Sequence, residues 1–287
     1  KGTTFGVPFT FDINTKDNSF TNKVFNFNAR SLKLNIFNES IAKDKDSIIG
    51  KNIISFLNSK IKTKYNIKEK LINFESDNSR LNTSKIDYTG NLSINPFDLD
   101  LDIDLGEYRI SKLFNFNSIL KEFIKTGLPF NDNLSLDLSL LAKTNSLDEI
   151  FQKTKINLNI INGKFNLNDS IFVNNKMGLL KLINSNLFIK NNELILNTDI
   201  LITIKDTKSL FTFLNTNKKF RKEIKDILIN LDYNFLSNEI KFNNFKIDNK
   251  NVSNELLDII EGFNEIKLNN LIKSRRLLNK LFDVYEG

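Results

Sequence analysis

An alternation of apolar and polar side chains with a period of two residues runs through most of the chain and limits what it can fold into. Successive side chains of a β-strand point to opposite faces of a sheet, so each such segment has one apolar and one polar face. This pattern is typical of half-buried antiparallel strands. It occurs at Phe9–Ile13, Phe25–Phe27, Leu32–Ile36, Leu92–Ile94, Phe97–Leu105, Leu134–Leu140, Ile156–Ile160, Phe165–Leu167, Leu187–Ile189, Leu194–Leu196, Ile200–Ile204, Leu231–Tyr233, Ile240–Phe242 and Phe245–Ile247.

Short polar clusters around Gly163, Asn191 and Ser237 separate several of these segments and indicate hairpin turns. The sequence therefore predicts an α+β, mainly β fold with a long, curved antiparallel sheet that forms an open groove or a partial barrel. We expect one domain over residues 1–287, because no linker rich in Pro, Gly or Ser divides the chain. Residues 1–12 lack both a Met and a signal-peptide apolar region, so we expect a fragment of a longer chain whose N-terminal anchor lies upstream.

A period of three to four residues replaces the alternation in a few places. Apolar residues from Leu113 to Ile124 recur at this spacing, and Gly127 and Pro129 follow where a helix would end, which predicts an amphipathic helix. We therefore expect a few packed amphipathic helices and a helical C-terminus. The other predicted helices are Leu147–Phe151, Leu210–Leu214 continuing into Phe220–Leu228, Leu256–Phe263 and Leu268–Phe282.

The segment INPFDLDLDIDL, from Ile94 to Leu105, places four aspartates at alternate positions. An EF-hand loop begins D-x-D-x-D-G and ends in a bidentate Glu that completes the calcium site. When the loop is aligned on Asp100, Leu105 takes the Gly position and Ser111 takes the Glu position, so the motif fails twice. We expect a strand that begins at Pro96 and has the carboxylates on its polar face; a weak divalent-cation site is the alternative. The apolar row that should face the core or a lipid consists of Phe97, Leu99, Leu101, Ile103 and Leu105.

The chain contains no Cys and no His. Their absence excludes disulfides, thiolate metal sites, a Cys nucleophile, and a His general base or zinc ligand. No Gly-rich phosphate loop, Rossmann fingerprint or Walker sequence is present. We therefore expect no enzyme, with no catalytic, cofactor-binding or metal-binding residues and no cofactor.

The net charge of +7 raises the alternatives of nucleic-acid binding and anionic-membrane binding. The basic residues are spread along the chain, and the densest cluster is KKFRKEIK at residues 218–225. On a helix such a cluster is most often a solvated face. Stacking of nucleic-acid bases would need aromatic residues on the same face as Lys and Arg. Most Phe residues lie at the apolar positions of the alternation, whereas the basic residues lie at the polar positions. We therefore expect no nucleic-acid partner.

Several motifs give the chain a resemblance to a known family. They are FLNSK followed by Tyr65, IDYTGNLSINPFDLDLDIDL from Ile86 to Leu105, INGKFNLNDSIF from Ile161 to Phe172, and a helical tail ending VYEG. Together they resemble the C-terminal region of AsmA-like proteins over most of the chain. The shared landmarks are Y-x-G, a Pro-Phe pair that opens a strand, and N-G-x-F followed by N-x-S.

The resemblance implies a bacterial envelope protein that is anchored in the inner membrane by an N-terminal helix and lies mainly in the periplasm. It also implies kinship with bridge-like lipid-transfer proteins, whose long curved sheets form an apolar groove, and a role in outer-membrane biogenesis by moving phospholipid. No site residues carry over, because the family has no agreed catalytic or ligand motif. The pattern itself supports a lipid partner, because helices are few relative to strands and an apolar sheet face must be covered.

Two other classes of function stay open. One is a structural or scaffolding module whose sheet is fully covered and whose partners are other envelope proteins. The other is a calcium-stabilised surface or adhesion domain. An uncovered apolar face would favour lipid binding over scaffolding, and a melting temperature that calcium does not change would exclude the calcium-stabilised domain.

Overall fold

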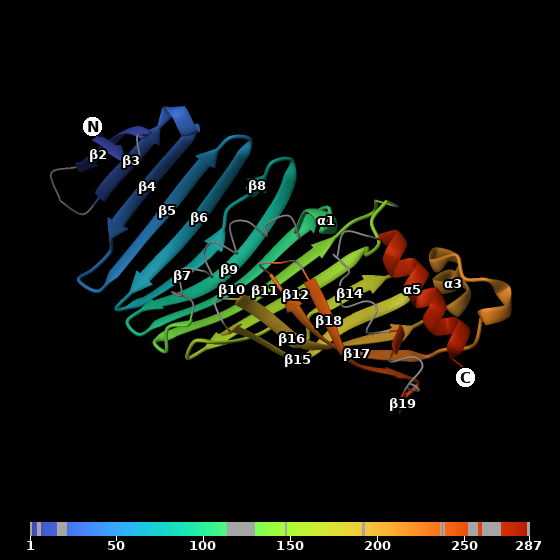
Figure 1. The fold of residues 1–287 in the computed structure, drawn as a ribbon. Helices are drawn as coiled ribbons and strands as arrows, with labels where there is room; N and C mark the ends of the chain where they lie inside the picture. The colour runs from blue at the N-terminus through green and yellow to red at the C-terminus, as the bar shows by residue number, and fades with distance from the viewer. Residues whose placement is uncertain are drawn as a thin grey trace. The chain divides into compact units, whose positions relative to one another are not determined.

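A computed structural model of the chain shows a mainly β protein, as the alternation predicts (Figure 1). The structure describes residues 2–4, 7–15, 22–113, 130–146, 148–190, 193–235, 237, 239–251, 258–259 and 271–285. Its contacts divide the chain into two compact units, which are described separately below. Unit 1 contains Lys1–Arg109 and Asn133–Thr144, and unit 2 contains Ile110–Asp132 and Asn145–Gly287. The single domain expected over residues 1–287 stays a prediction.

Unit 1 is a sheet whose strands lie side by side in nearly the order of the sequence. Neighbouring strands from the first to the tenth pair antiparallel, as the predicted hairpins require. The 3-10 turn η1 (Arg30–Leu32) joins the third strand to the fourth, so Leu32 lies outside the strand predicted to contain it. The strands are β1 (Gly2–Thr4), β2 (Val7–Thr15), β3 (Asn22–Ala29), β4 (Leu34–Ala42), β5 (Ser47–Phe56), β6 (Ser59–Lys68), β7 (Leu71–Ser76), β8 (Ser79–Leu81), β9 (Ser84–Ile94), β10 (Phe97–Glu107) and β11 (Leu134–Lys143).

The last strand of unit 1 departs from the predicted antiparallel sheet. β11 pairs with β10 in parallel, with Phe97 opposite Leu134 and Leu101 opposite Leu138. A parallel neighbour needs a crossover connection of roughly a dozen residues or more, and the long segment between β10 and β11 supplies it. The expectation of antiparallel pairing throughout is therefore wrong at this pair. β10 also begins one residue later than predicted, because Pro96 lies in the two-residue turn between β9 and β10.

β7 and β8 share one position in the sheet, between β6 and β9. The strand is interrupted at Asn78, which adopts the left-handed conformation with φ of 58°. Buried Ser79 restores the interrupted ladder: its hydroxyl accepts a hydrogen bond from the Lys62 N–H at 2.8 Å and donates one to the Lys62 carbonyl at 2.8 Å. The interruption therefore leaves the backbone of β6 hydrogen-bonded.

Unit 2 contains a second run of antiparallel strands, and it repeats the same interruption. β13 and β14 share the position between β12 and β15. Asp169 is left-handed, with φ of 62°, and the hydroxyl of buried Ser170 accepts from the Asn157 N–H and donates to the Asn157 carbonyl. The strands are β12 (Lys153–Ile161), β13 (Lys164–Asn166), β14 (Ile171–Asn174), β15 (Gly178–Lys190), β16 (Glu193–Ile204), β17 (Asp226–Asn234), β18 (Glu239–Ile247) and β19 (Lys250–Asn251).

Two helices pack in unit 2, α3 (Thr207–Leu214) and α5 (Leu271–Val284). Asp206 caps α3 by accepting hydrogen bonds from the backbone N–H groups of Lys208 and Ser209. The side chain of Asn279, on α5, donates to the Leu214 carbonyl at 2.9 Å and accepts from the Thr216 hydroxyl at 2.5 Å. The end of α3 is thereby tied to α5.

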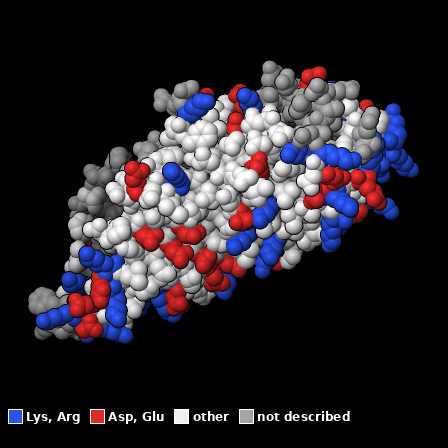
Figure 2. Space-filling model, turned by 90° about the horizontal axis from the view of Figure 1, so that it is seen from below, with Lys and Arg blue, Asp and Glu red and all other residues white. Residues whose placement is uncertain are grey.

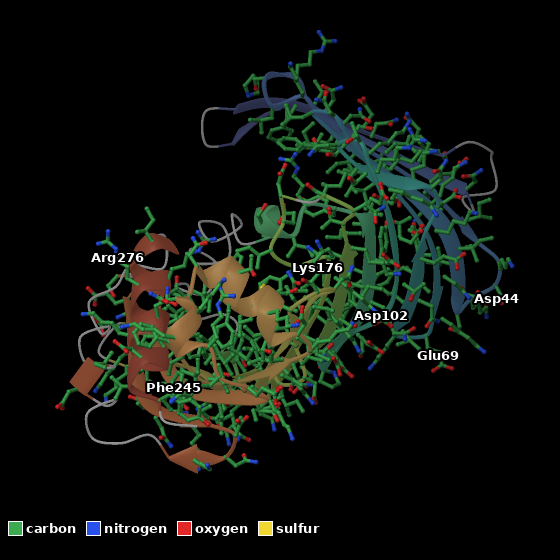
Figure 3. All side chains as sticks on the ribbon, turned by 90° about the vertical axis from the view of Figure 1, so that its right-hand side faces the viewer. Asp44, Glu69, Asp102, Lys176, Phe245 and Arg276 are labelled. Atoms are coloured by element: carbon green, nitrogen blue, oxygen red, sulfur yellow. The ribbon has the colours of Figure 1, made fainter. Side chains whose placement is uncertain are left out.

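The helices α3 and α5 cover one face of the sheet in unit 2 and complete a hydrophobic core with it. Figure 3 shows Phe245, from the sheet, next to α5. This core confirms the expected packing of amphipathic helices on a sheet. Its buried members are Phe211 and Leu214 from α3, Ile224, Ile227, Ile229 and Leu231 from the segment through β17, Phe245 and Ile247 from β18, and Leu281, Phe282 and Tyr285 at the C-terminus.

Two helix predictions are confirmed and two are wrong. α3 includes the predicted Leu210–Leu214, and α5 confirms the helical C-terminus predicted at Leu268–Phe282. The described residues of Leu147–Phe151 form no helix. Phe220–Leu228 is also not an α-helix, because the 3-10 turn η4 (Lys218–Phe220) ends at its start and β17 then pairs with β16.

Other predicted elements fall partly outside the described residues. The structure describes only Leu113 of the helix predicted from Leu113 to Ile124, and Leu113 is the last residue of α1 (Ile110–Leu113). Of Leu256–Phe263, only residues 258–259 are described, and both are helical. The turn at Gly163 is confirmed, with positive φ at both of its central residues, whereas Asn191 lies outside the described residues. In the described part of the chain, no helix combines the length and the apolar character needed to cross a membrane.

Candidate functional site

One face of the unit 1 sheet is mainly apolar from β2 to β11, and a single polar row of Asn38, Asn52, Thr63 and Ser76 crosses it. Directly paired residues on neighbouring strands share a face, so the register defines this surface: Phe27 lies opposite Ile36, and Ile54 lies opposite both Ile36 and Ile61. We call this surface the unit 1 apolar face. It consists of Phe11, Ile13, Phe25, Phe27, Leu34, Ile36, Ile48, Ile54, Phe56, Ile61, Tyr65, Ile67, Ile72, Phe74, Tyr88, Leu92, Ile94, Phe97, Leu99, Leu101, Ile103, Leu105, Leu134, Leu136, Leu138 and Leu140.

Most side chains of the unit 1 apolar face are half-buried, and several are exposed. Ile13 and Ile94 are each 65% exposed, and Phe11 is 49% exposed. Of the residues that define the face, only Leu105 is buried. In the described part of unit 1 the only helical element is the three-residue η1. That part of unit 1 therefore contributes no helix that covers the face.

The same alternating pattern has a different outcome in unit 2. Ile227, Ile229 and Leu231 of β17 are 3%, 8% and 7% exposed, because α3 and α5 pack on them. The sequences of the two sheets are similar in period and in residue type, so the covering helices account for the difference. Each apolar side chain left half-exposed forgoes part of the stabilisation of about 1.5–3 kcal/mol that full burial provides. The unit 1 apolar face is therefore the part of the described chain best suited to a hydrophobic ligand.

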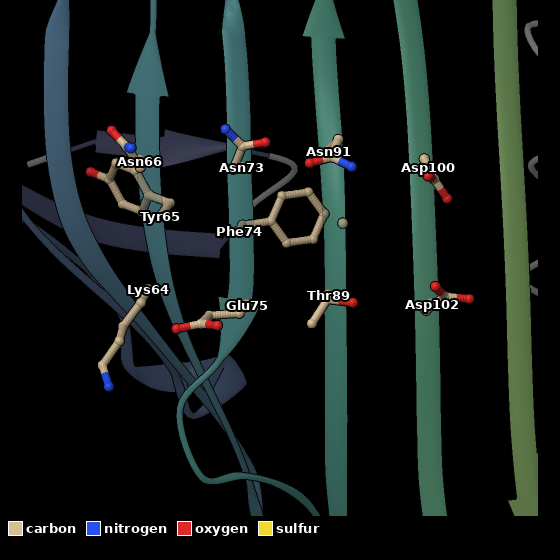
Figure 4. A pocket seen from close by; sticks show the side chains of 11 residues that line it. Lys64, Tyr65, Asn66, Asn73, Phe74, Glu75, Thr89, Asn91, Asp100 and Asp102 are labelled. Carbon is tan, nitrogen blue, oxygen red and sulfur yellow. The ribbon is translucent and has the colours of Figure 1, made fainter.

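A row of two aromatic residues and two glycines crosses the unit 1 apolar face. Gly50 pairs with Tyr65, Tyr65 with Phe74, and Phe74 with Gly90. A Cβ on Gly50 would lie 2.4 Å from the Tyr65 ring, and one on Gly90 would lie 2.5 Å from the Phe74 ring. Figure 4 shows the Phe74 ring extending toward the strand of Thr89 and Asn91. Each ring therefore covers the backbone that its glycine leaves bare, and the row stays apolar.

The opposite face of the same strands is polar and contains an open depression of about 370 Å³ (Figure 4). Eight of the eleven residues that line it belong to two polar rows defined by the register. The first row is Asn66, Asn73, Asn91 and Asp100, and the second is Lys64, Glu75, Thr89 and Asp102. Amide and carboxylate groups at these positions offer hydrogen bonds to solvent or to a polar ligand.

The aspartates of the INPFDLDLDIDL segment lie on this polar face. Asp100 is opposite Asn91 and Asp102 is opposite Thr89, whereas Leu99 and Leu101 belong to the apolar face. The predicted strand with one wet and one apolar side is thus confirmed. Among the described residues, no three acidic side chains lie close enough together to hold a metal ion. The Asp104 carboxylate instead accepts a hydrogen bond from the Gly106 N–H at 2.7 Å.

Three titratable groups of unit 2 have displaced pKa values for structural reasons. The hydrogen bond from the Ser209 hydroxyl, at 2.5 Å, lowers the pKa of the capping carboxylate of Asp206. Burial raises the pKa of Tyr233. Burial also raises the pKa of Tyr285, and the negative charge and hydrogen bonding of Asp248 add to that effect. These shifts come from helix capping and core packing.

Compared with known proteins, the chain matches no protein-family model and no curated protein sequence. The AsmA-like resemblance therefore stays a prediction. The sequence indicated no site residues, and it also missed the aromatic–glycine row, because Gly50 and Tyr65 meet only through the pairing of β5 with β6. The apolar alternation along each strand is the signal from which the apolar face itself was predicted.

Proposed function

We propose that the protein binds the acyl chains of phospholipids on the unit 1 apolar face, as a non-enzymatic domain that assists lipid transfer in envelope biogenesis. The observation that carries the proposal is that apolar side chains lie on that face at every strand position from β2 to β11, and that all of them except Leu105 are half-buried or exposed. A soluble protein rarely leaves so much contiguous apolar surface to water unless something binds there.

The energetics favour acyl chains as the ligand. Each methylene that leaves water for an apolar surface contributes about 0.8 kcal/mol. A dozen methylenes lying along the Phe27, Ile36, Ile54 and Ile61 row would contribute roughly 10 kcal/mol before the cost of ordering the chain. No directed polar contact is required, because most side chains of the face are aliphatic or aromatic, and the row of Asn38, Asn52, Thr63 and Ser76 is the polar exception. This suits a surface along which lipid moves without being held at one site.

The cellular setting of the proposal follows from the AsmA-like resemblance. We propose a periplasmic location and an inner-membrane anchor upstream of this sequence, with a role in the assembly of the outer membrane. The curved groove expected of such proteins is part of the same proposal. The runner-up, a scaffolding module whose apolar face is covered by another envelope protein, differs in what occupies the face.

Lipid co-purification with matched variants tests the proposal. Ile53 and Ile54 are adjacent half-buried residues of β5, and only Ile54 lies on the unit 1 apolar face, because Ile53 pairs with Lys62 on the polar face. We expect wild-type protein purified without detergent to carry phospholipid that native mass spectrometry and lipid extraction detect. Ile54→Asp should lose most of that lipid, whereas Ile53→Asp should retain it.

Circular dichroism of both variants shows whether the fold is kept. Wild-type protein without any bound phospholipid, or an equal loss of lipid in the two variants, would contradict the proposal. A lipid-free wild type would favour the scaffolding alternative.

A further inference from the structure

Folding gathers the surplus positive charge of the chain into one part of unit 2. Residues 206–225 carry six basic and two acidic side chains, and α5 carries four basic and one acidic side chain. Their combined surplus of seven positive charges equals the net charge of the whole chain, +7. All other residues therefore balance to zero. The sequence shows the first segment as the dense cluster at residues 218–225, but it does not show that α5 joins it, because the two segments are more than forty residues apart in the chain.

Direct contacts hold the two basic segments together. Arg275 of α5 lies over the Phe213 ring of α3, with its guanidinium carbon 4.7 Å from the ring centroid. Lys222 donates a hydrogen bond to the Tyr285 carbonyl just beyond α5. Figure 2 shows Lys and Arg side chains gathered at the right-hand end, where Figure 1 places α3 and α5.

Most basic side chains at this end are exposed, and one of them, Arg221, also donates a hydrogen bond from Nε to the Thr216 carbonyl at 3.0 Å. Lys218, Lys219 and Arg221 around η4 are exposed, and so are Arg276 and Lys280 on α5. Figure 3 shows Arg276 extending outward from the helix. Among the described residues, none of these five forms an ion pair. We call Lys218, Lys219, Arg221, Arg276 and Lys280 the basic end of unit 2.

An exposed apolar side chain accompanies the charges. Ile272, Arg276 and Lys280 are spaced four residues apart, so they lie along one side of α5. Ile272 is 65% exposed, and it is the first of the three along the helix. Basic residues beside an exposed aliphatic residue on an amphipathic helix are typical of segments that lie on anionic membrane surfaces.

We propose that the basic end of unit 2 docks on a bilayer surface that contains anionic phospholipids. Each Lys or Arg near such a surface raises the partition coefficient about fivefold at physiological ionic strength. The docking is independent of acyl-chain binding on the unit 1 apolar face, because it uses headgroup charge and a different unit.

A membrane fits these residues better than a nucleic acid does. Base stacking needs exposed aromatic rings among the basic residues, but Phe211 and Phe282 are buried, Arg275 covers Phe213, and the Lys219 ammonium lies over the ring of half-buried Phe220, 4.3 Å from its centroid. The exposed apolar residue at this end is the aliphatic Ile272, which suits the boundary between headgroups and acyl chains.

Vesicle flotation of the full 287-residue chain tests the docking. Vesicles of phosphatidylcholine mixed with phosphatidylglycerol should bind the protein, and high salt should release it. The triple variant Lys218→Gln, Lys219→Gln and Arg221→Gln should bind these vesicles about a hundredfold more weakly. The matched control, Lys60→Gln, Lys68→Gln and Lys70→Gln, removes the same charge from exposed residues of unit 1 and should bind as the wild type does.

Four outcomes would overturn the proposal. These are equal weakening in the two triple variants, binding that does not depend on phosphatidylglycerol or salt, displacement by inorganic phosphate at matched ionic strength, and tighter binding to an oligonucleotide than to vesicles. Uptake of lipid from vesicles of phosphatidylcholine alone measures acyl-chain binding on the unit 1 apolar face. A failure of the docking proposal can therefore be distinguished from a failure of the proposed function.

Discussion

Replacing Ser79 by Ala should destabilise the protein far more than is usual for a serine in a sheet. Ser79 is 0% exposed, and its hydroxyl makes two hydrogen bonds to the backbone of Lys62, each 2.8 Å long. Alanine leaves the Lys62 N–H without its partner, whereas the Lys62 carbonyl still accepts hydrogen bonds from the Asp77 N–H at 2.8 Å and from the Tyr88 hydroxyl at 3.1 Å. A buried polar group left unsatisfied costs about 1–3 kcal/mol. We expect Ser79→Ala to lower the free energy of unfolding by about 1–3 kcal/mol.

Urea denaturation followed by far-ultraviolet circular dichroism measures this change, since the chain contains no Trp. The denaturation midpoint should fall at an unchanged m-value. Ser170→Ala is the equivalent change in unit 2, because its hydroxyl bridges the Asn157 backbone in the same way. Ser93→Ala is the matched control on a half-buried strand position and should cost less than about 0.5 kcal/mol. If Ser79→Ala costs no more than Ser93→Ala, the bridging role of the hydroxyl is refuted.

Three further predictions concern a glycine, a tyrosine and the aspartates. Gly90→Ala would place a Cβ 2.4 Å from the Asp100 carbonyl and 2.5 Å from the Phe74 ring, so we expect a loss of about 1–3 kcal/mol in urea melts; wild-type stability would contradict the close packing of that row. The raised pKa of Tyr285 means that the folded state holds the phenol proton more tightly than the unfolded state. The contribution of protonated Tyr285 to the free energy of unfolding is therefore complete below pH 10 and is lost as pH rises through the folded-state pKa. Tyr285→Phe should flatten the fall of the melting temperature above pH 10, and an unaltered slope would count against this linkage. Calcium should leave the melting temperature unchanged relative to a chelator, because no three acidic side chains of the described residues converge; an increase with calcium would revive the cation site.

Strands were predictable because their signal is local. The period of two residues identified β10 and placed Asp100 and Leu99 on opposite faces before any pairing was known. The hairpin turn at Gly163 was equally accessible, because residues with positive φ are required at fixed positions in a short turn. A helix prediction was wrong where pairing with a neighbouring strand stabilises a strand in a segment whose local periodicity is helical. The segment Phe220–Leu228 has apolar residues at helical spacing, yet pairing of Ile227 with Ile202 on β16 draws it into the sheet.

Contacts between segments far apart in the chain could not be predicted from the sequence. The parallel pairing of β11 with β10 depends on a long crossover whose path no local pattern specifies. The gathering of charge at the basic end of unit 2 depends on contacts between α3, η4 and α5, so the sequence showed the cluster at residues 218–225 but not the basic residues of α5 beside it.

The structure gives physical reasons for some of the landmarks behind the AsmA-like resemblance. In N-x-S, Ser170 bridges the backbone of Asn157 where β13 gives way to β14. In Y-x-G, the Tyr88 hydroxyl is 2.6 Å from that of Thr63, and Gly90 makes room for the Phe74 ring. These landmarks therefore have structural roles in the sheet. A lipid-binding role has to be tested on the unit 1 apolar face.

Photo-crosslinking from adjacent positions of β10 tests lipid binding on the unit 1 apolar face most directly. A photoreactive amino acid at position 99 replaces Leu99 on the apolar face, and one at position 100 replaces Asp100 on the polar face. We expect irradiation of the purified protein with phospholipid to label position 99 and to leave position 100 unlabelled. Equal labelling of both positions, or labelling of position 100 alone, would contradict the assignment of the apolar face as the lipid-binding surface.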